Sequence, residues 1–152
     1  MTPIDARNKM TGKPLGISYS VAGLSGRQKQ LLVKLSTYGS ELVVPKRRVT
    51  MRDLAALTAS EQVEFALFTR KNERLIIRGG NMTVPIQPAD AKRLAADGWR
   101  WSGHTHPGYG HLVLAPSIGD KAVLACFSQK YSLIFNSGGR FLIFDLDGEV
   151  IL

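Results

Sequence analysis

The order of short apolar runs and helical stretches is the feature that most constrains how this chain can fold. The apolar runs are rich in β-branched and aromatic residues, which favours strands, and the stretches between them favour helices. We expect strands at residues 63–68, 75–77, 99–104, 132–136 and 141–146, with a further short strand at Val84 and Ile86. We expect helices at residues 27–38, 51–62, 89–97 and 117–128. The pattern predicts an α+β domain with a mainly antiparallel or mixed β-sheet flanked by two or three helices.

The length and the turn signals indicate how the chain is divided. Its 152 residues have room for one domain. Glycine and proline punctuate the first 26 residues, where no helical stripe persists. We therefore expect residues 1–50 to form a basic N-terminal extension, partly loop and partly short helix, and residues 51–152 to form the domain proper. Asp147-Gly148 predicts a hairpin that leads into a last strand at residues 150–152.

Positive charge is concentrated towards the N-terminus. Residues 1–52 hold ten lysines and arginines but two acidic residues, whereas the remainder of the chain is balanced. A basic segment of this kind can meet nucleic acid, an acidic partner protein or a membrane surface. The alternative is a solvated basic face that only keeps the chain in solution.

The sequence lacks long apolar segments and has one cysteine, which excludes several classes of protein. No apolar run approaches the length of a membrane-spanning helix, and the first residues lack the apolar stretch of a signal peptide. We therefore expect no membrane span. Cys126 is the single cysteine, so an internal disulfide and a cysteine-cluster metal site are both excluded.

The histidines suggest a metal site. His104 and His106 stand two residues apart in an expected strand, so their side chains project to the same face. Asp120, at the start of the next expected helix, adds a carboxylate. Two histidines, one carboxylate and an open position make up a catalytic zinc site, because the metal acidifies and orients a water there. The structural alternative is that Ser117 and Asp120 only form a capping box and that the histidines lie on a surface loop.

The sequences His104-Thr105-His106-Pro107 and Pro116-Ser117-Ile118-Gly119-Asp120 resemble the signature of the JAMM (MPN-plus) metallopeptidases. The resemblance implies Zn²⁺ held by His104, His106 and Asp120. It implies that Ser117 positions the water and stabilises the oxyanion.

The resemblance also implies a general base, the family's upstream glutamate, which corresponds here to Glu64 at the start of an apolar run; Glu61 is the rival. It covers roughly residues 64–135 and makes 51–152 a JAMM-like catalytic domain. The loop at residues 107–116 is three residues longer than in the common family pattern, which puts the register of Ser117 and the shape of the substrate groove in question.

The implied activity is hydrolysis of a peptide or isopeptide amide bond in a protein or peptide substrate. The same region, with residues 131–140, is similar to C-terminal domains of bacterial polymorphic toxins and to domains fused to phage head-morphogenesis proteins. That similarity implies an effector delivered into a target cell as part of a larger secreted protein, with a cognate immunity protein; a cytoplasmic protein is the other expectation. The alternative hypotheses are a metal-dependent nuclease or nucleic-acid-binding toxin that uses the basic N-terminal segment, and a non-enzymatic scaffold.

Overall fold

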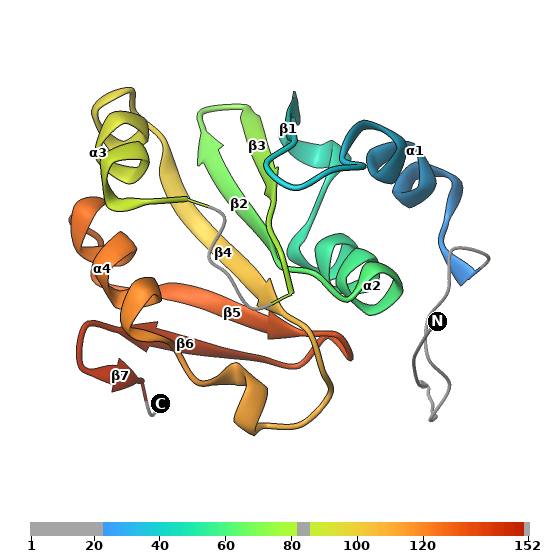
Figure 1. Ribbon diagram of the computed structural model, residues 1–152. Coiled ribbons are helices and arrows are strands. Elements are labelled where there is room, and N and C mark those ends of the chain that lie inside the picture. Colours follow the sequence, from blue (N-terminus) through green and yellow to red (C-terminus); the bar gives the residue numbers. More distant parts are fainter. Residues whose placement is uncertain (1–22, 82–85, 151–152) are drawn as a thin grey trace.

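The computed structural model describes residues 23–81 and 86–150. In this part of the chain seven strands form one mixed sheet, in the order β1-β3-β2-β4-β5-β6-β7 (Figure 1). The strands are β1 (Glu41–Pro45), β2 (Phe65–Arg70), β3 (Glu73–Arg78), β4 (Arg100–His106), β5 (Ser132–Asn136), β6 (Phe141–Asp145) and β7 (Gly148–Glu149). The helices are α1 (Gly26–Lys34), α2 (Met51–Glu61), α3 (Pro88–Ala96) and α4 (Ile118–Cys126), with short 3-10 turns η2 (Lys46–Arg48) and η3 (Leu112–Leu114). The predicted α+β class with a mixed sheet is confirmed.

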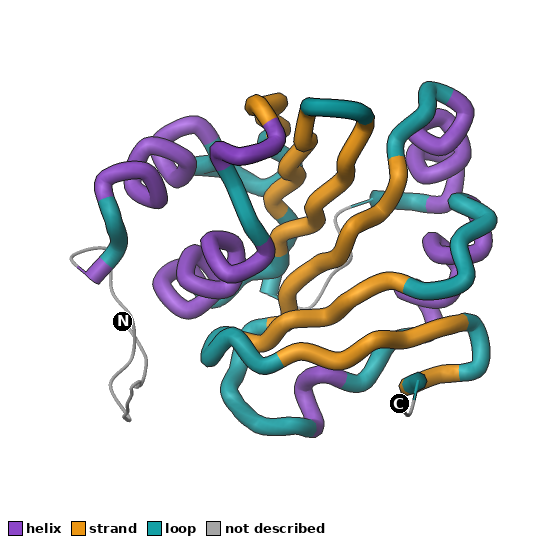
Figure 2. The backbone as a smooth tube through the Cα atoms, turned by 180° about the vertical axis from the view of Figure 1, so that it is seen from behind, coloured by secondary structure: helices purple, strands orange, loops and turns teal. Residues whose placement is uncertain are grey.

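Helices cover both faces of the sheet, as the two views in Figures 1 and 2 show. Alternate residues of β2 point to opposite faces, because side chains alternate along a strand. Phe65 and Leu67 join the apolar core under α1 and α2, whereas Ala66 and Phe68 join the core under α3 and α4. The continuous apolar run of β2 is therefore the run of a central strand that is buried on both sides.

β4 lies at the centre of the sheet and carries an irregularity that the sequence does not reveal. It pairs antiparallel with β2 and parallel with β5. Leu67 opposes Gly103 and Phe68 opposes Trp101, so Ser102 is an extra residue in a β-bulge. A bulge of this kind resets the alternation of side chains. The alternation expected for residues 99–104 is therefore wrong, since Trp101 and His104 stack on the same face.

The helices begin where their capping residues predict. Thr50 caps α2 and forms a capping box with Asp53, as expected from the sequence. Pro88 opens α3. The first helix differs, because α1 ends at Lys34, earlier than the expected residue 38.

Three strand expectations differ from the structure at the edges of the sheet. Residues 41–45, placed in the N-terminal extension from the sequence, form the edge strand β1, which pairs antiparallel with β3. The short strand expected near Val84 and Ile86 is not found at Ile86, which is buried but lies outside any strand; Val84 lies outside the described residues. The hairpin at Asp147-Gly148 forms, and its second strand, β7, is Gly148–Glu149. Of the strand expected at 150–152, Val150 lies outside any strand, and residues 151–152 lie outside the described residues.

No helix in the described part of the chain is both long enough and apolar enough to cross a membrane.

Candidate metal centre

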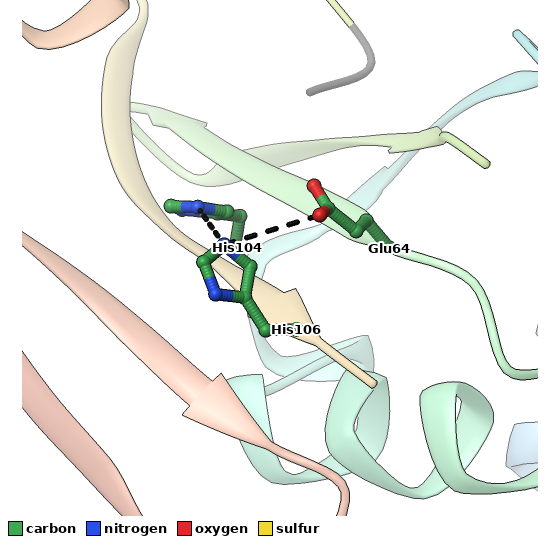
Figure 3. Close-up of side chains that lie close together, drawn as sticks. All are labelled: Glu64, His104 and His106. Carbon is green, nitrogen blue, oxygen red and sulfur yellow. Dashed lines mark hydrogen bonds and ion pairs between the residues drawn. The ribbon is translucent and has the colours of Figure 1, made fainter. Parts of the chain in front are cut away.

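Neighbouring strands bring a carboxylate and two imidazoles to one face of the sheet. His104 and His106 lie at the C-terminal end of β4, and His104 pairs with Ala66 of β2, whose side chain faces α3 and α4. Glu64 directly precedes β2 and continues its pairing, because its N–H donates to the Gly80 carbonyl at 2.8 Å. Glu64 therefore shares the face of Ala66. Figure 3 shows Glu64 and the two histidines converging from these strands.

Asp120 approaches the same histidines from α4. Ser117 is the N-cap of α4, and its hydroxyl accepts the Asp120 N–H at 3.0 Å. In return, the Ser117 N–H donates to Asp120 Oδ2 at 2.8 Å. This capping box fixes the aspartate rotamer, and the Asp120 side chain is fully buried. The capping box of Ser117 and Asp120 therefore forms, and it also aims the carboxylate at the histidines.

The separations between these groups match those of atoms that share one ion. His104 Nε2 and His106 Nε2 are 3.1 Å apart. Asp120 Oδ1 lies 3.0 Å from His104 Nε2, and Asp120 Oδ2 lies 3.4 Å from His106 Nε2. Glu64 Oε2 is farther, at 3.9 Å from His106 Nε2. Two ligand atoms on a tetrahedral zinc with ordinary bond lengths are about 3.3 Å apart.

A ligand atom from each of Glu64, His104 and His106 lies within 4.8 Å of the other two, which is close enough to hold a metal ion. Two carboxylate oxygens at this place lack other partners. Glu64 Oε1 and Asp120 Oδ1 are buried, and neither accepts a hydrogen bond from a described residue outside the site, although Asp120 Oδ1 faces His104 Nε2 at 3.0 Å. Buried, unsatisfied oxygens of this kind are costly. A cation between them and the imidazoles would satisfy them, so the donor set fits a metal such as zinc.

The imidazole of His106 is oriented by the loop that follows β4. Its Nδ1 donates a hydrogen bond to the Val113 carbonyl, which leaves the Nε2 lone pair directed at the other ligands. The loop at residues 107–116 therefore orients a side chain of the site through its backbone. No feature of the sequence marks Val113, since the contact is made by its backbone.

Burial and charge perturb every titrating group of the site. Burial raises the pKa of Glu64 to about 8, against the opposing charge of His106. Burial also lowers the pKa of His104. For His106, burial alone would lower the pKa, but hydrogen bonding to Asp120 and the charges of both carboxylates raise it. For Asp120, burial alone would raise the pKa, but the two histidines and the Ser117 N–H hold it well below its usual value.

These opposite shifts separate the two carboxylates. At neutral pH and without a metal, Asp120 is ionised while Glu64 holds a proton. Carboxylates with pKa values that differ in this way commonly divide the roles of charged ligand and proton-transfer group.

A buried hydroxyl network connects the two strands behind the ligands. Thr105, between the two histidines, points to the opposite face and meets Thr58 of α2 hydroxyl to hydroxyl. The Thr105 hydroxyl also accepts the Phe65 N–H at 2.9 Å. Phe65 directly follows Glu64, so this network fixes the glutamate backbone relative to β4. The alternation of β4 could have indicated Thr105, although not its partner on α2.

The remaining polar residues considered from the sequence lie outside this group. Glu61 ends α2 and forms an ion pair with Arg78 at 3.1 Å, so Glu64 is the glutamate that contacts the histidines. His111 is exposed on the loop and lies 3.7 Å from Glu149. Ser117 is exposed at the start of α4.

Comparisons with known protein families, with curated proteins and with solved structures find no match for this chain. The resemblance to the JAMM metallopeptidases therefore stays a prediction from the sequence.

Proposed function

We propose that this protein is a zinc-dependent hydrolase of the JAMM type that cleaves a peptide or isopeptide amide bond. The observation that carries the proposal is the convergence of Glu64, His104, His106 and Asp120, with two buried carboxylate oxygens that have no other partner in the described chain.

The distances support a division of the four side chains into three ligands and a base. His104, His106 and Asp120 would hold the zinc, because their atoms stand 3.0–3.4 Å apart, as ligands of one ion do. Glu64 Oε2 lies farther away, at 3.9 Å from His106 Nε2. We therefore assign Glu64 as the general base. Burial raises the pKa of Glu64 to about 8 in the metal-free site, and the charge of a bound ion would lower that pKa and free the carboxylate to take and return a proton.

A zinc ion held by His104, His106 and Asp120 would supply Lewis acidity, which would polarise an amide carbonyl and acidify a water molecule. Glu64 takes the proton of the attacking water on a carboxylate oxygen and returns it to the nitrogen of the departing amine. Asp120 would remain ionised and offset one of the two positive charges of the ion.

Ser117 can act both as the N-cap of α4 and as a hydrogen-bond donor to the substrate. Its hydroxyl oxygen accepts the Asp120 N–H, which leaves the hydroxyl hydrogen free to be donated. Donation to the oxyanion that develops on the substrate carbonyl is the role that the resemblance assigns to this serine. The delivered-effector setting and the cognate immunity protein belong to the same proposal and rest on the sequence resemblance.

The test compares Glu64→Gln with Glu61→Gln, a matched control at the rival glutamate. Each protein is loaded with zinc, its metal content is measured, and cleavage of a peptide library is followed by mass spectrometry. We expect the wild type and Glu61→Gln to cleave peptides, and Glu64→Gln to retain zinc without cleaving. Cleavage by zinc-loaded Glu64→Gln at the wild-type rate would overturn the assignment of the base, and an inert wild type with zinc bound would overturn the proposed activity.

A further inference from the structure

A basic pocket lies at the end of the sheet opposite to the metal centre. It has a volume of about 650 Å³ and is formed by the end of β1, the turn η2, the start of α2 and the β2–β3 turn. Its lining residues are Pro45, Lys46, Arg47, Val49, Thr50, Asn72 and Arg74. Three of the seven are cations and none is acidic. The Lys46 N–H donates to the Asn72 carbonyl at 2.7 Å, and this hydrogen bond joins η2 to the β2–β3 turn.

No residue of the described ranges 23–81 and 86–150 neutralises the cations of this pocket. Lys46, Arg47 and Arg74 form no ion pair with any residue that the structure describes. Two acidic residues near the pocket already have partners, since Asp53 pairs with Arg27 and Glu73 pairs with Arg70. Glu41 lies at the other end of β1 and does not line the pocket. The pocket therefore has a net positive charge that an anionic ligand would offset.

Arg74 is the recessed member of the set. One guanidinium nitrogen donates to the Val49 carbonyl at 2.8 Å, whereas its Nε is buried without a hydrogen-bond partner in the described chain. Burial penalises its charge and lowers the pKa of Arg74. Arginine presents several N–H donors in a plane and suits the oxygens of a phosphate group.

The cationic surface continues beyond the pocket. Arg48 is exposed and has no ion pair among the described residues. Arg27 of α1 donates to the Arg48 carbonyl, which places the first turn of α1 beside η2. A ligand with several phosphates in a row would contact these cations in succession.

We propose that this pocket binds a phosphate group of a single-stranded nucleic acid. Its volume is in the range of small-molecule sites and admits a phosphate with its sugar. A flexible single strand can direct one phosphate to the recessed Arg74, which the rigid backbone of a duplex reaches less well. Pro45 and Val49 add an apolar wall for the sugar or the base.

The pocket is separate from the metal centre. Glu64 precedes β2, and the turn that contains Asn72 follows β2, so the two sites lie at opposite ends of that strand (Figure 1). A strand of this length spans about 20 Å. The inference is therefore independent of the proposed hydrolase function, and Glu64→Gln should bind nucleic acid as the wild type does.

The test measures binding of fluorescein-labelled single-stranded DNA and RNA 12-mers to the full chain by fluorescence anisotropy at several salt concentrations. The variant is Lys46→Gln with Arg47→Gln, two exposed positions whose replacement leaves the core intact. The control, Lys92→Gln with Lys130→Gln, removes the same charge from exposed positions elsewhere. Arg74→Gln, checked for folding by circular dichroism, tests the recessed cation.

We expect Lys46→Gln/Arg47→Gln to lower the affinity roughly 10-fold or more at 0.1 M salt and to reduce the slope of log K against log salt by about 0.7, since the pocket holds one phosphate and each lost phosphate contact removes about 0.7. The control should keep the wild-type slope. An unchanged slope in the variant, or an equal loss in the control, would overturn the proposal. Equal binding of a duplex through the same residues would overturn its single-strand part. Binding of anionic vesicles or a phosphopeptide in place of the strands would assign the pocket to another partner and overturn it.

Discussion

Glu64 carries the most specific prediction, because its burial couples protonation to folding. Its side chain is 7% exposed, and its pKa rises from the ordinary 4.5 to about 8 in the folded protein. Below pH 4.5 both the folded and the unfolded chain hold the proton. As the pH rises from 4.5 to 8, the unfolded chain loses the proton while the folded chain keeps it, so the free energy of unfolding falls. Above pH 8 both states are ionised and the loss is complete.

The size of the loss follows from the pKa values. Each pH unit between the two values lowers the free energy of unfolding by about 1.4 kcal/mol, so the total for Glu64 reaches at most about 5 kcal/mol. Glu64→Gln keeps the shape of the side chain and removes the titration. We therefore expect the variant to gain stability over the metal-free wild type, with a difference that grows steadily between pH 5 and pH 8.

The assay is urea unfolding of chelator-treated protein at pH 5, 6, 7 and 8. Glu61→Gln is the control, because that carboxylate is paired with Arg78 and lies outside the metal centre. Its difference from the wild type should not follow the pH in this way. Parallel stability profiles for the wild type and Glu64→Gln would refute the reasoning, since they would mean that burial does not hold the proton on Glu64.

Three further predictions follow from the same structure. Gly103→Ala should destabilise the protein by about 1–3 kcal/mol in urea unfolding, because the added Cβ would meet the Leu133 carbonyl of β5 at 3.0 Å. The same contact should weaken zinc binding, because it would displace β4, which carries both histidines. Thr105→Val should lower the free energy of unfolding by about 1–3 kcal/mol, because it leaves the buried Phe65 N–H without its acceptor. Zinc binding at pH 7 should release about one proton fewer in Glu64→Gln than in the wild type, measured by calorimetry in buffers of different ionisation enthalpy.

Much of the fold could be predicted from local patterns. The capping box at Thr50, the proline at the start of α3 and the turn at Asp147-Gly148 each specify one conformation within a few residues of chain. The edge strand β1 could not be predicted, because residues 41–45 form a strand only by pairing with β3. The bulge at Ser102 has the same cause, since it exists only as a mismatch of register between β2 and β4.

The side chains of the candidate site could be predicted from the sequence, but the contacts that hold them in place could not. The spacing of His104 and His106 dictates a shared face, and the helix start at Ser117 dictates the position of Asp120. The Val113 carbonyl and the contact between Thr58 and Thr105 depend on loop and helix positions that no local motif encodes.

The metal content of the protein tests the central claim most directly. We would purify the chain without a histidine tag or chelator and measure metals by elemental mass spectrometry, beside a His104→Ala/His106→Ala variant and His111→Ala as a control outside the site. The geometry predicts about one zinc per chain in the wild type and in His111→Ala, and its loss in the double variant. A wild type without metal, or an equal metal content in the double variant, would contradict the metal centre.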